Sequence, residues 1–200
     1  EGVAVLCDAA ARGRPGVGRT VVPRALREAG SAELDGGVCT HDDADHGRGL
    51  VPLFGRIRIR EIVVGESVPP SLRALAALHG IPIRRARAGH TLWRGAGLRI
   101  ETIADGHGMT GSNDQSLVLV AALGDHRILL PADCEEAGLR SLLQRGLPPC
   151  SVLIAPHHGA VLHPREIGIQ LARMVRPHWE LTSEGRRVFD ANPLVATGPE

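Results

Sequence analysis

The sequence has 200 residues, of which 43% are hydrophobic and 22% charged, and its formal net charge is +1. A chain of this length can bury one good core or two small ones. The near-neutral charge argues against a protein that coats nucleic acid by charge alone, and no apolar run reaches the roughly 18 residues that span a bilayer. The cysteines (Cys7, Cys39, Cys134 and Cys150) form no CxxC pair, which argues against a thiolate zinc site.

Short apolar runs alternate with helical patterns along the chain. Strands are predicted at residues 3–7, 37–40, 58–64, 98–104, 116–123, 127–131 and 152–155, and helices at 21–29, 71–79, 135–144 and 164–175. Strands that interleave with helices in this way favour an α/β fold. We expect one domain over residues 1–200, and the start at Glu1 indicates a piece of a longer protein.

Polar side chains follow three of the predicted strands at the point where each strand ends. These side chains are Thr40 and His41, then Asp133, and then His157 and His158. Because α/β proteins place their sites where strand ends converge on one sheet edge, we expect these residues to share a site.

The densest polar cluster is the stretch THDDADHG at residues 40–47. Its imidazoles and carboxylates are ligands that divalent metals accept. The spacing predicts a tight loop, because a regular helix would send Asp43 to the face away from His41. Gly47 is suited to turning the chain into a following helix near Gly49 and Leu50. A solvated acidic loop with two histidines is the alternative reading of this stretch alone.

The order of these motifs resembles that of the metallo-β-lactamase superfamily. The nearer match is to the metallo-β-lactamase domain of ComEC-type competence proteins, which take up DNA and carry the pattern DaG, THxDxDHxGG, NxxSLVL, GDxE and PHHGS. The corresponding stretches here are DAA at 8–10, THDDADHGRG at 40–49, NDQSLVL at 113–119, ADCE at 132–135 and PHHGA at 156–160. The resemblance covers roughly residues 1 to 160.

The resemblance implies an α/β metallo-β-lactamase fold, a four-layer αββα sandwich with the metal site at one edge of the sheets. It implies two divalent ions, zinc or manganese. The implied ligands are His41, Asp43, Asp45, His46, Asp133 and His157. His158 is expected to support the site or contact the substrate, and Asp45 to orient the attacking hydroxide. The domain is expected to be soluble and, as in the family, attached to a bacterial membrane protein.

Two metal ions lower the pKa of a bridging water to near neutrality and stabilise the developing oxyanion. The resemblance therefore implies a metal-dependent phosphodiesterase or nuclease that acts on DNA. A hydrolase of a small ester, lactone or thioester is the alternative within the same fold. A structural module that has lost catalysis is the third reading.

Several positions depart from the family pattern. Ala132 replaces the glycine before the strand-end Asp133, which a methyl group tolerates only if the backbone φ is not positive. The superfamily often carries a further histidine between the first motif and the strand-end aspartate. The candidates for it in this sequence are His107 and His90. From about residue 161 the C-terminal part is expected to be shortened.

Two runs of arginine remain outside these motifs. Arg56, Arg58 and Arg60 alternate with isoleucines, which is typical of the solvent face of a strand. A second run occupies positions 84, 85 and 87. The functional alternative for both runs is an edge that follows the phosphates of a nucleic acid, although no aromatic side chain interleaves for base stacking.

Overall fold

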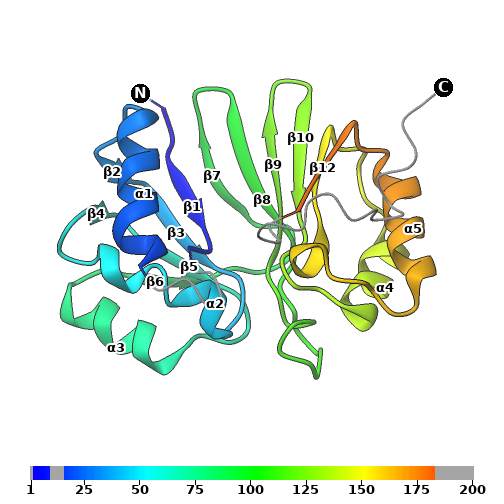
Figure 1. Ribbon diagram of the computed structural model, residues 1–200, viewed down its shortest axis with the longest axis horizontal. Coiled ribbons are helices and arrows are strands. Elements are labelled where there is room, and N and C mark those ends of the chain that lie inside the picture. Colours follow the sequence, from blue (N-terminus) through cyan, green and yellow to red (C-terminus); the bar gives the residue numbers. More distant parts are fainter. Residues whose placement is uncertain (1, 10–15, 183–200) are drawn as a thin grey trace. The chain divides into compact units, whose positions relative to one another are not determined.

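The computed structural model describes residues 2–9 and 16–182, without the side chains of Ala44 and Asp45. The chain divides into two compact units, Glu1–Arg87 and Ala88–Glu200, which we call the N-terminal and C-terminal units. Each unit has its own main sheet (Figure 1). Each unit also has its own hydrophobic core. The predicted α/β class is confirmed. A single domain over 1–200, a stack of four layers and a shortened C-terminal part stay predictions.

The N-terminal unit is built on a four-stranded parallel sheet in the order β1-β3-β5-β6. Its strands are β1 (Val5–Cys7), β3 (Gly36–Cys39), β5 (Ile62–Val64) and β6 (Ile83–Arg85), and a separate parallel pair joins β2 (Glu33–Leu34) to β4 (Arg58–Ile59). Its helices are α1 (Val17–Glu28), α2 (Ala44–Gly47), the 3-10 turn η1 (Val51–Leu53) and α3 (Pro70–Leu78). Leu50, Leu53, Ile62 and Leu72 are fully buried in its core, which also includes Cys39, the last residue of β3 before the 40–47 stretch.

The C-terminal unit is built on a six-stranded sheet in the order β12-β11-β10-β9-β8-β7. Its strands are β7 (Thr91–Gly95), β8 (Leu98–Ala104), β9 (Val118–Leu123), β10 (His126–Leu130), β11 (Val152–Ile154) and β12 (Trp179–Leu181). Its helices are α4 (Glu136–Arg145), the 3-10 turn η2 (Pro156–Gly159) and α5 (Arg165–Val175). Strands β7 to β10 are antiparallel, and β10, β11 and β12 are parallel.

The core of the C-terminal unit lies between one face of this sheet and helices α4 and α5. Val118 and Val120 of β9 and Leu129 of β10 pack with Leu139 of α4 and Ile167 of α5. The apolar positions of each helix recur at helical spacing, which gives each helix one face to bury.

The predicted strand at 58–64 is wrong, because the structure has two strands there. Arg58 and Ile59 pair with β2, whereas Ile62–Val64 enters the central parallel sheet with all three residues buried. The sequence shows the change: an alternating pattern up to residue 60 gives way to a continuous apolar run. A fully buried parallel strand needs such a run, and an exposed edge strand does not.

Two helix predictions also need correction. Helix α1 begins at Val17 and not at residue 21, so Pro23 lies in its interior. No helix begins at Gly49; instead the one-turn helix α2 precedes it and η1 follows. Gly47 is required for space, because a Cβ there would lie 2.7 Å from the Cys39 sulfur.

The strands β2, β6, β7 and β12 are not among the predicted elements, because their sequences are short or rich in polar residues. Within residues 2–9 and 16–182, no helix combines the length and the apolar character that crossing a bilayer requires.

Candidate metal centre

The predicted ligands of the N-terminal unit lie at the C-terminal end of β3. His41 and His46 are buried, and the centroids of their rings are 4.1 Å apart. Asp43 stands at the start of α2, and its Oδ2 lies 3.7 Å from Nε2 of His41. Ligand atoms that share one metal at about 2.1 Å lie about 3–3.5 Å apart. The separation between His41 and Asp43 is therefore close to that of two ligands of one ion.

Asp8 holds this group through a chain of hydrogen bonds. The backbone N–H and the hydroxyl of Thr40 donate to the Asp8 carboxylate at 3.0 and 2.8 Å. Nδ1 of His46 lies 2.8 Å from Asp8 Oδ2, and Nδ1 of His41 lies 3.0 Å from the Thr40 hydroxyl oxygen. Since the single hydroxyl proton of Thr40 goes to Asp8, the His41 ring is the donor to Thr40.

Both histidines therefore carry their proton on Nδ1, which leaves the lone pair of Nε2 available. A carboxylate behind the imidazole is the arrangement that orients histidine ligands in metal sites. Asp8 supports both rings at once, directly for His46 and through Thr40 for His41.

The predicted ligands of the C-terminal unit lie where β10 and β11 end. These two strands are parallel, so their C-terminal ends meet at one edge of the sheet. Asp133 follows β10 and is buried, and the His157 backbone N–H donates to the carbonyl of Ala132 at 2.9 Å. Asp133 Oδ2 lies 3.8 Å from Nε2 of His157 and 3.5 Å from Nε2 of His158. Both imidazoles therefore face the same carboxylate.

Glu135 contacts His157, the first of the two adjacent histidines. Its Oε1 lies 3.1 Å from Nδ1 of His157 and accepts a hydrogen bond from the Asn113 side chain at 2.9 Å. His157 is therefore held between a carboxylate at Nδ1 and Asp133 at Nε2, which is again the geometry of an oriented metal ligand.

The stretch at 113–116 supports this loop from behind. The Asp133 N–H donates to the hydroxyl of Ser116 at 3.3 Å. Asp114 accepts the backbone N–H groups of Glu135 and Gly138 at 2.9 and 2.8 Å, and so caps the start of α4. A Cβ at Gly138 would lie 2.9 Å from the Asp114 carboxylate, so glycine allows this approach. The stretch thus fixes Asp133 and Glu135 in place.

Comparisons with known proteins give the fold. No family model matches the sequence, and no curated protein matches it. Among solved structures, the diiron β-hydroxylase CmlA from Streptomyces venezuelae, a protein of the metallo-β-lactamase fold, aligns at 15% identity with a TM-score of 0.51 over 77% of this chain and 36% of that chain. The chain has the metallo-β-lactamase fold. It spans just over a third of the length of CmlA.

Two further structures are similar more weakly. A diphosphatase of the PhnP family is 19% identical over 88% of this chain and 69% of that chain, with a TM-score of 0.47. A metallo-β-lactamase from Hirschia baltica is 17% identical over 65% of this chain and 53% of that chain, with a TM-score of 0.36.

Several residues at or next to the candidate ligands have a left-handed backbone conformation. Asp8 (φ 47°), Ala132 (φ 52°), His157 (φ 48°) and His158 (φ 62°) all have positive φ. Ala132 therefore occupies a conformation that glycine adopts without cost, at an expense of about 1–2 kcal/mol. Strain of this kind persists where the surrounding contacts hold a site in place.

The buried cysteines beside the candidate ligands are neutral thiols. Burial, reinforced by the neighbouring carboxylates, raises the pKa of Cys39 and of Cys134 far above the ordinary value. The Cys39 thiol donates to the carbonyl of His41 at 3.0 Å, and so helps to shape the loop.

The remaining predicted residues divide into two groups. The backbone of Asp45 lies in α2, but its side chain is outside the described part of the structure. His90 and His107 are exposed. The positioning carboxylates Asp8 and Glu135 were not predicted as such; their only signal was a place in the motifs DAA and ADCE.

The donor set of each unit, taken by itself, suits a divalent metal. It consists of imidazole nitrogens and carboxylate oxygens, which zinc and manganese both accept. In each unit one histidine is backed by a carboxylate at Nδ1, as the ligands of such an ion require.

Proposed function

We propose that this protein is a metal-dependent hydrolase that holds two divalent ions, zinc or manganese. The proposed ligands are His41, Asp43, Asp45, His46, Asp133 and His157. The observation that supports the proposal most is the pair of histidines backed by carboxylates, His46 by Asp8 and His157 by Glu135. A surface histidine has no need of such a partner, whereas a metal ligand does.

Divalent ions bound there would lower the pKa of an attacking water and stabilise the negative charge that develops on the substrate. The residues of the chain supply the positioning. Asp8 and Glu135 keep the Nδ1 protons of their histidines in place, so that each Nε2 keeps its lone pair. We assign Asp45 to orienting the attacking water. His158, whose Nε2 lies 3.5 Å from Asp133, is assigned to contact the substrate.

We propose a phosphodiester of DNA as the substrate. The support is the resemblance of residues 40–49, 132–135 and 156–160 to the metallo-β-lactamase domain of ComEC-type proteins. On this proposal the natural partner is DNA, and the domain belongs to a larger bacterial membrane protein.

Metal content by mass spectrometry is the first test. We expect about two equivalents in the wild type and one or none in the Asp45→Ala/His46→Ala variant. Cleavage of DNA with manganese and with zinc follows, alongside a small ester and a lactone. Cleavage of the ester or the lactone without cleavage of DNA would assign a small substrate. If the folded wild type takes up neither ion, the proposal is overturned, and a structural module without catalysis is the remaining interpretation.

A further inference from the structure

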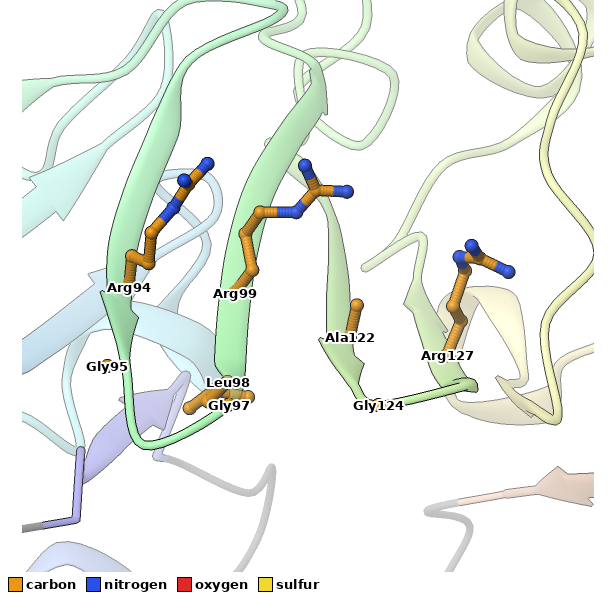
Figure 2. Close-up of a pocket in the computed structure, with 8 residues that line it drawn as sticks. All are labelled: Arg94, Gly95, Gly97, Leu98, Arg99, Ala122, Gly124 and Arg127. Carbon is orange, nitrogen blue, oxygen red and sulfur yellow. The ribbon is translucent and has the colours of Figure 1, made fainter.

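Three arginines stand in one row across the sheet of the C-terminal unit. Arg94 of β7 is the register partner of Arg99 of β8, Arg99 is the partner of Ala122 of β9, and Ala122 is the partner of Arg127 of β10. Residues in register project from the same face of a sheet. Figure 2 shows the three guanidinium groups on that common side, with only the methyl group of Ala122 between Arg99 and Arg127.

The row differs from the arginine runs of the N-terminal unit, in which five of the six arginines pair with a carboxylate. The pairs there are Arg58 and Arg60 with Glu33, Arg84 with Glu61, and Arg85 and Arg87 with Glu66. In the row, Arg99 pairs with Glu101 at 3.2 Å. Across the described residues, neither Arg94 nor Arg127 forms an ion pair. With one carboxylate partner for three arginines, the row carries a larger excess of positive charge than either run, in which three arginines face two carboxylates.

This arrangement costs stability. Arg94 and Arg99 face each other directly in an antiparallel pair, and like charges in that position are destabilising. A sheet that keeps such a pair is locally inconsistent, and such inconsistencies concentrate at functional sites. An anion would remove the repulsion, and guanidinium groups match phosphate oxygens through paired hydrogen bonds.

A hollow of about 420 Å³ lies over the row. Besides the arginines and Ala122 it is lined by Gly95, Gly97, Gly124 and Leu98 (Figure 2). Glycines at its rim leave room for an approaching ligand. Among the residues that the structure describes, no aromatic side chain lines it, so these residues offer no platform on which a base could stack. Its arginines suit the negatively charged phosphate backbone of a nucleic acid and not its bases.

The row is longer than a single phosphate group. Strands lie about 4.8 Å apart, so the three steps from Arg94 to Arg127 span about 14 Å. Arg127 lies near the start of β10, whereas Asp133 follows the end of that strand. The row is thus at the other end of β10 from the candidate ligand, at least about 10 Å away along the strand. An extended polyanion fits this geometry better than one small ion.

We propose that Arg94, Arg99 and Arg127 bind the phosphate backbone of a single DNA strand, at a site separate from the candidate metal centre. The choice of DNA as the polyanion rests on the proposed function. The site itself rests on the register of the strands, on the single carboxylate partner that the three arginines have among the described residues, and on the hollow.

The test measures the salt dependence of binding to a fluorescent single-stranded oligonucleotide, by anisotropy, in the presence of EDTA. The test variant is Arg94→Gln/Arg99→Gln/Arg127→Gln. The control, Arg58→Gln/Arg85→Gln/Arg87→Gln, loses the same charge from paired arginines. Each phosphate contact on a single strand contributes about 0.7 to the slope of log K against log salt. We expect the test variant to lose about 2 from the slope and the control to keep it.

Ala122→Glu is a second variant that leaves all three arginines in place. A carboxylate between Arg99 and Arg127 would reduce the net positive charge of the row, so we expect weaker DNA binding together with a raised melting temperature. Equal losses in the test and control triple variants, or unchanged binding by Ala122→Glu, would overturn the proposal. Displacement of the DNA by pyrophosphate at equal phosphate concentration would do the same, since it would assign the row to a small phosphate.

Because EDTA removes any metal, this binding result is independent of catalysis. Loss of cleavage with intact binding in EDTA would count against the proposed hydrolase alone. The converse outcome is that the wild type cleaves DNA with metal while the test triple variant binds DNA as well as the wild type does. That result would count only against the proposed DNA-binding role of the row.

Discussion

The two units use the same device, a carboxylate behind a histidine, in different surroundings. In the N-terminal unit the side chains of Asp8 and His46 are 18% and 4% exposed. In the C-terminal unit those of Glu135 and His157 are 48% and 34% exposed. Water can replace a lost partner in an exposed pair but not in a buried one. Metal binding should therefore depend far more on the carboxylate partner in the N-terminal unit than in the C-terminal unit.

The largest effect is expected for Asp8→Asn. Asparagine tolerates the positive φ of this position, but it cannot accept the three hydrogen bonds that Asp8 receives from Thr40 and His46. We expect zinc affinity, measured by competition with a chromophoric chelator, to fall about 10–100-fold. Asp35→Asn, in the same unit but bonded to Ala4, is the control and should bind as the wild type does. Wild-type affinity in Asp8→Asn would refute the positioning role.

A smaller effect is expected for Glu135→Gln. The pair with His157 is half-exposed, so we expect zinc affinity to fall about 10-fold at most. The melting temperature in EDTA should not change. Glu136→Gln, which removes only an exposed partner of Arg140, serves as the control. A loss of zinc affinity as large as that of Asp8→Asn would show that the solvent exposure of a carboxylate–histidine pair does not determine how much it contributes to metal binding.

Backbone strain gives the next comparison. Aspartate at position 8 tolerates a left-handed conformation better than alanine at position 132 does. We expect Ala132→Gly to raise the free energy of unfolding by about 0.5–1 kcal/mol in denaturant titrations with EDTA. Ala121→Gly, within β9, should lower it, since glycine weakens a strand. A lower stability of Ala132→Gly would mean that this position carries no strain.

The smallest effect concerns two partly buried carboxylates. Glu61 is paired with Arg84, whereas burial raises the pKa of Glu180 on β12. A raised pKa favours the protonated form in the folded state. The stabilising contribution of Glu180 is therefore complete below its unfolded pKa of about 4.3 and is lost as the pH rises through the folded value.

Glu180→Gln should accordingly unfold at a higher temperature than the wild type at pH 7, and the two should converge towards pH 4. Glu61→Gln should unfold at a lower temperature at pH 7, because it removes the ion pair between Glu61 and Arg84. A constant difference between Glu180→Gln and the wild type across this pH range would contradict the assignment.

Local patterns were enough for most of the elements. The interleaved apolar runs predicted strands that the structure places at Leu98–Ala104 and Val152–Ile154 with little or no error. They failed at 58–64, where two strands of different sheets follow each other along the chain. Pairing with a distant strand, which no local pattern encodes, decided that difference.

The sequence by itself determined the fold class and nominated the histidines and aspartates of residues 41–46, 133 and 157–158, because these side chains follow apolar strands at motif spacing. The tertiary structure alone decided the partners. Asp8 reaches Thr40 and His46 because β1 lies beside β3. Arg94, Arg99 and Arg127 meet only through the register of four strands. A contact between residues far apart in the chain depends on how strands pair, and strand pairing is settled by burial of the whole core.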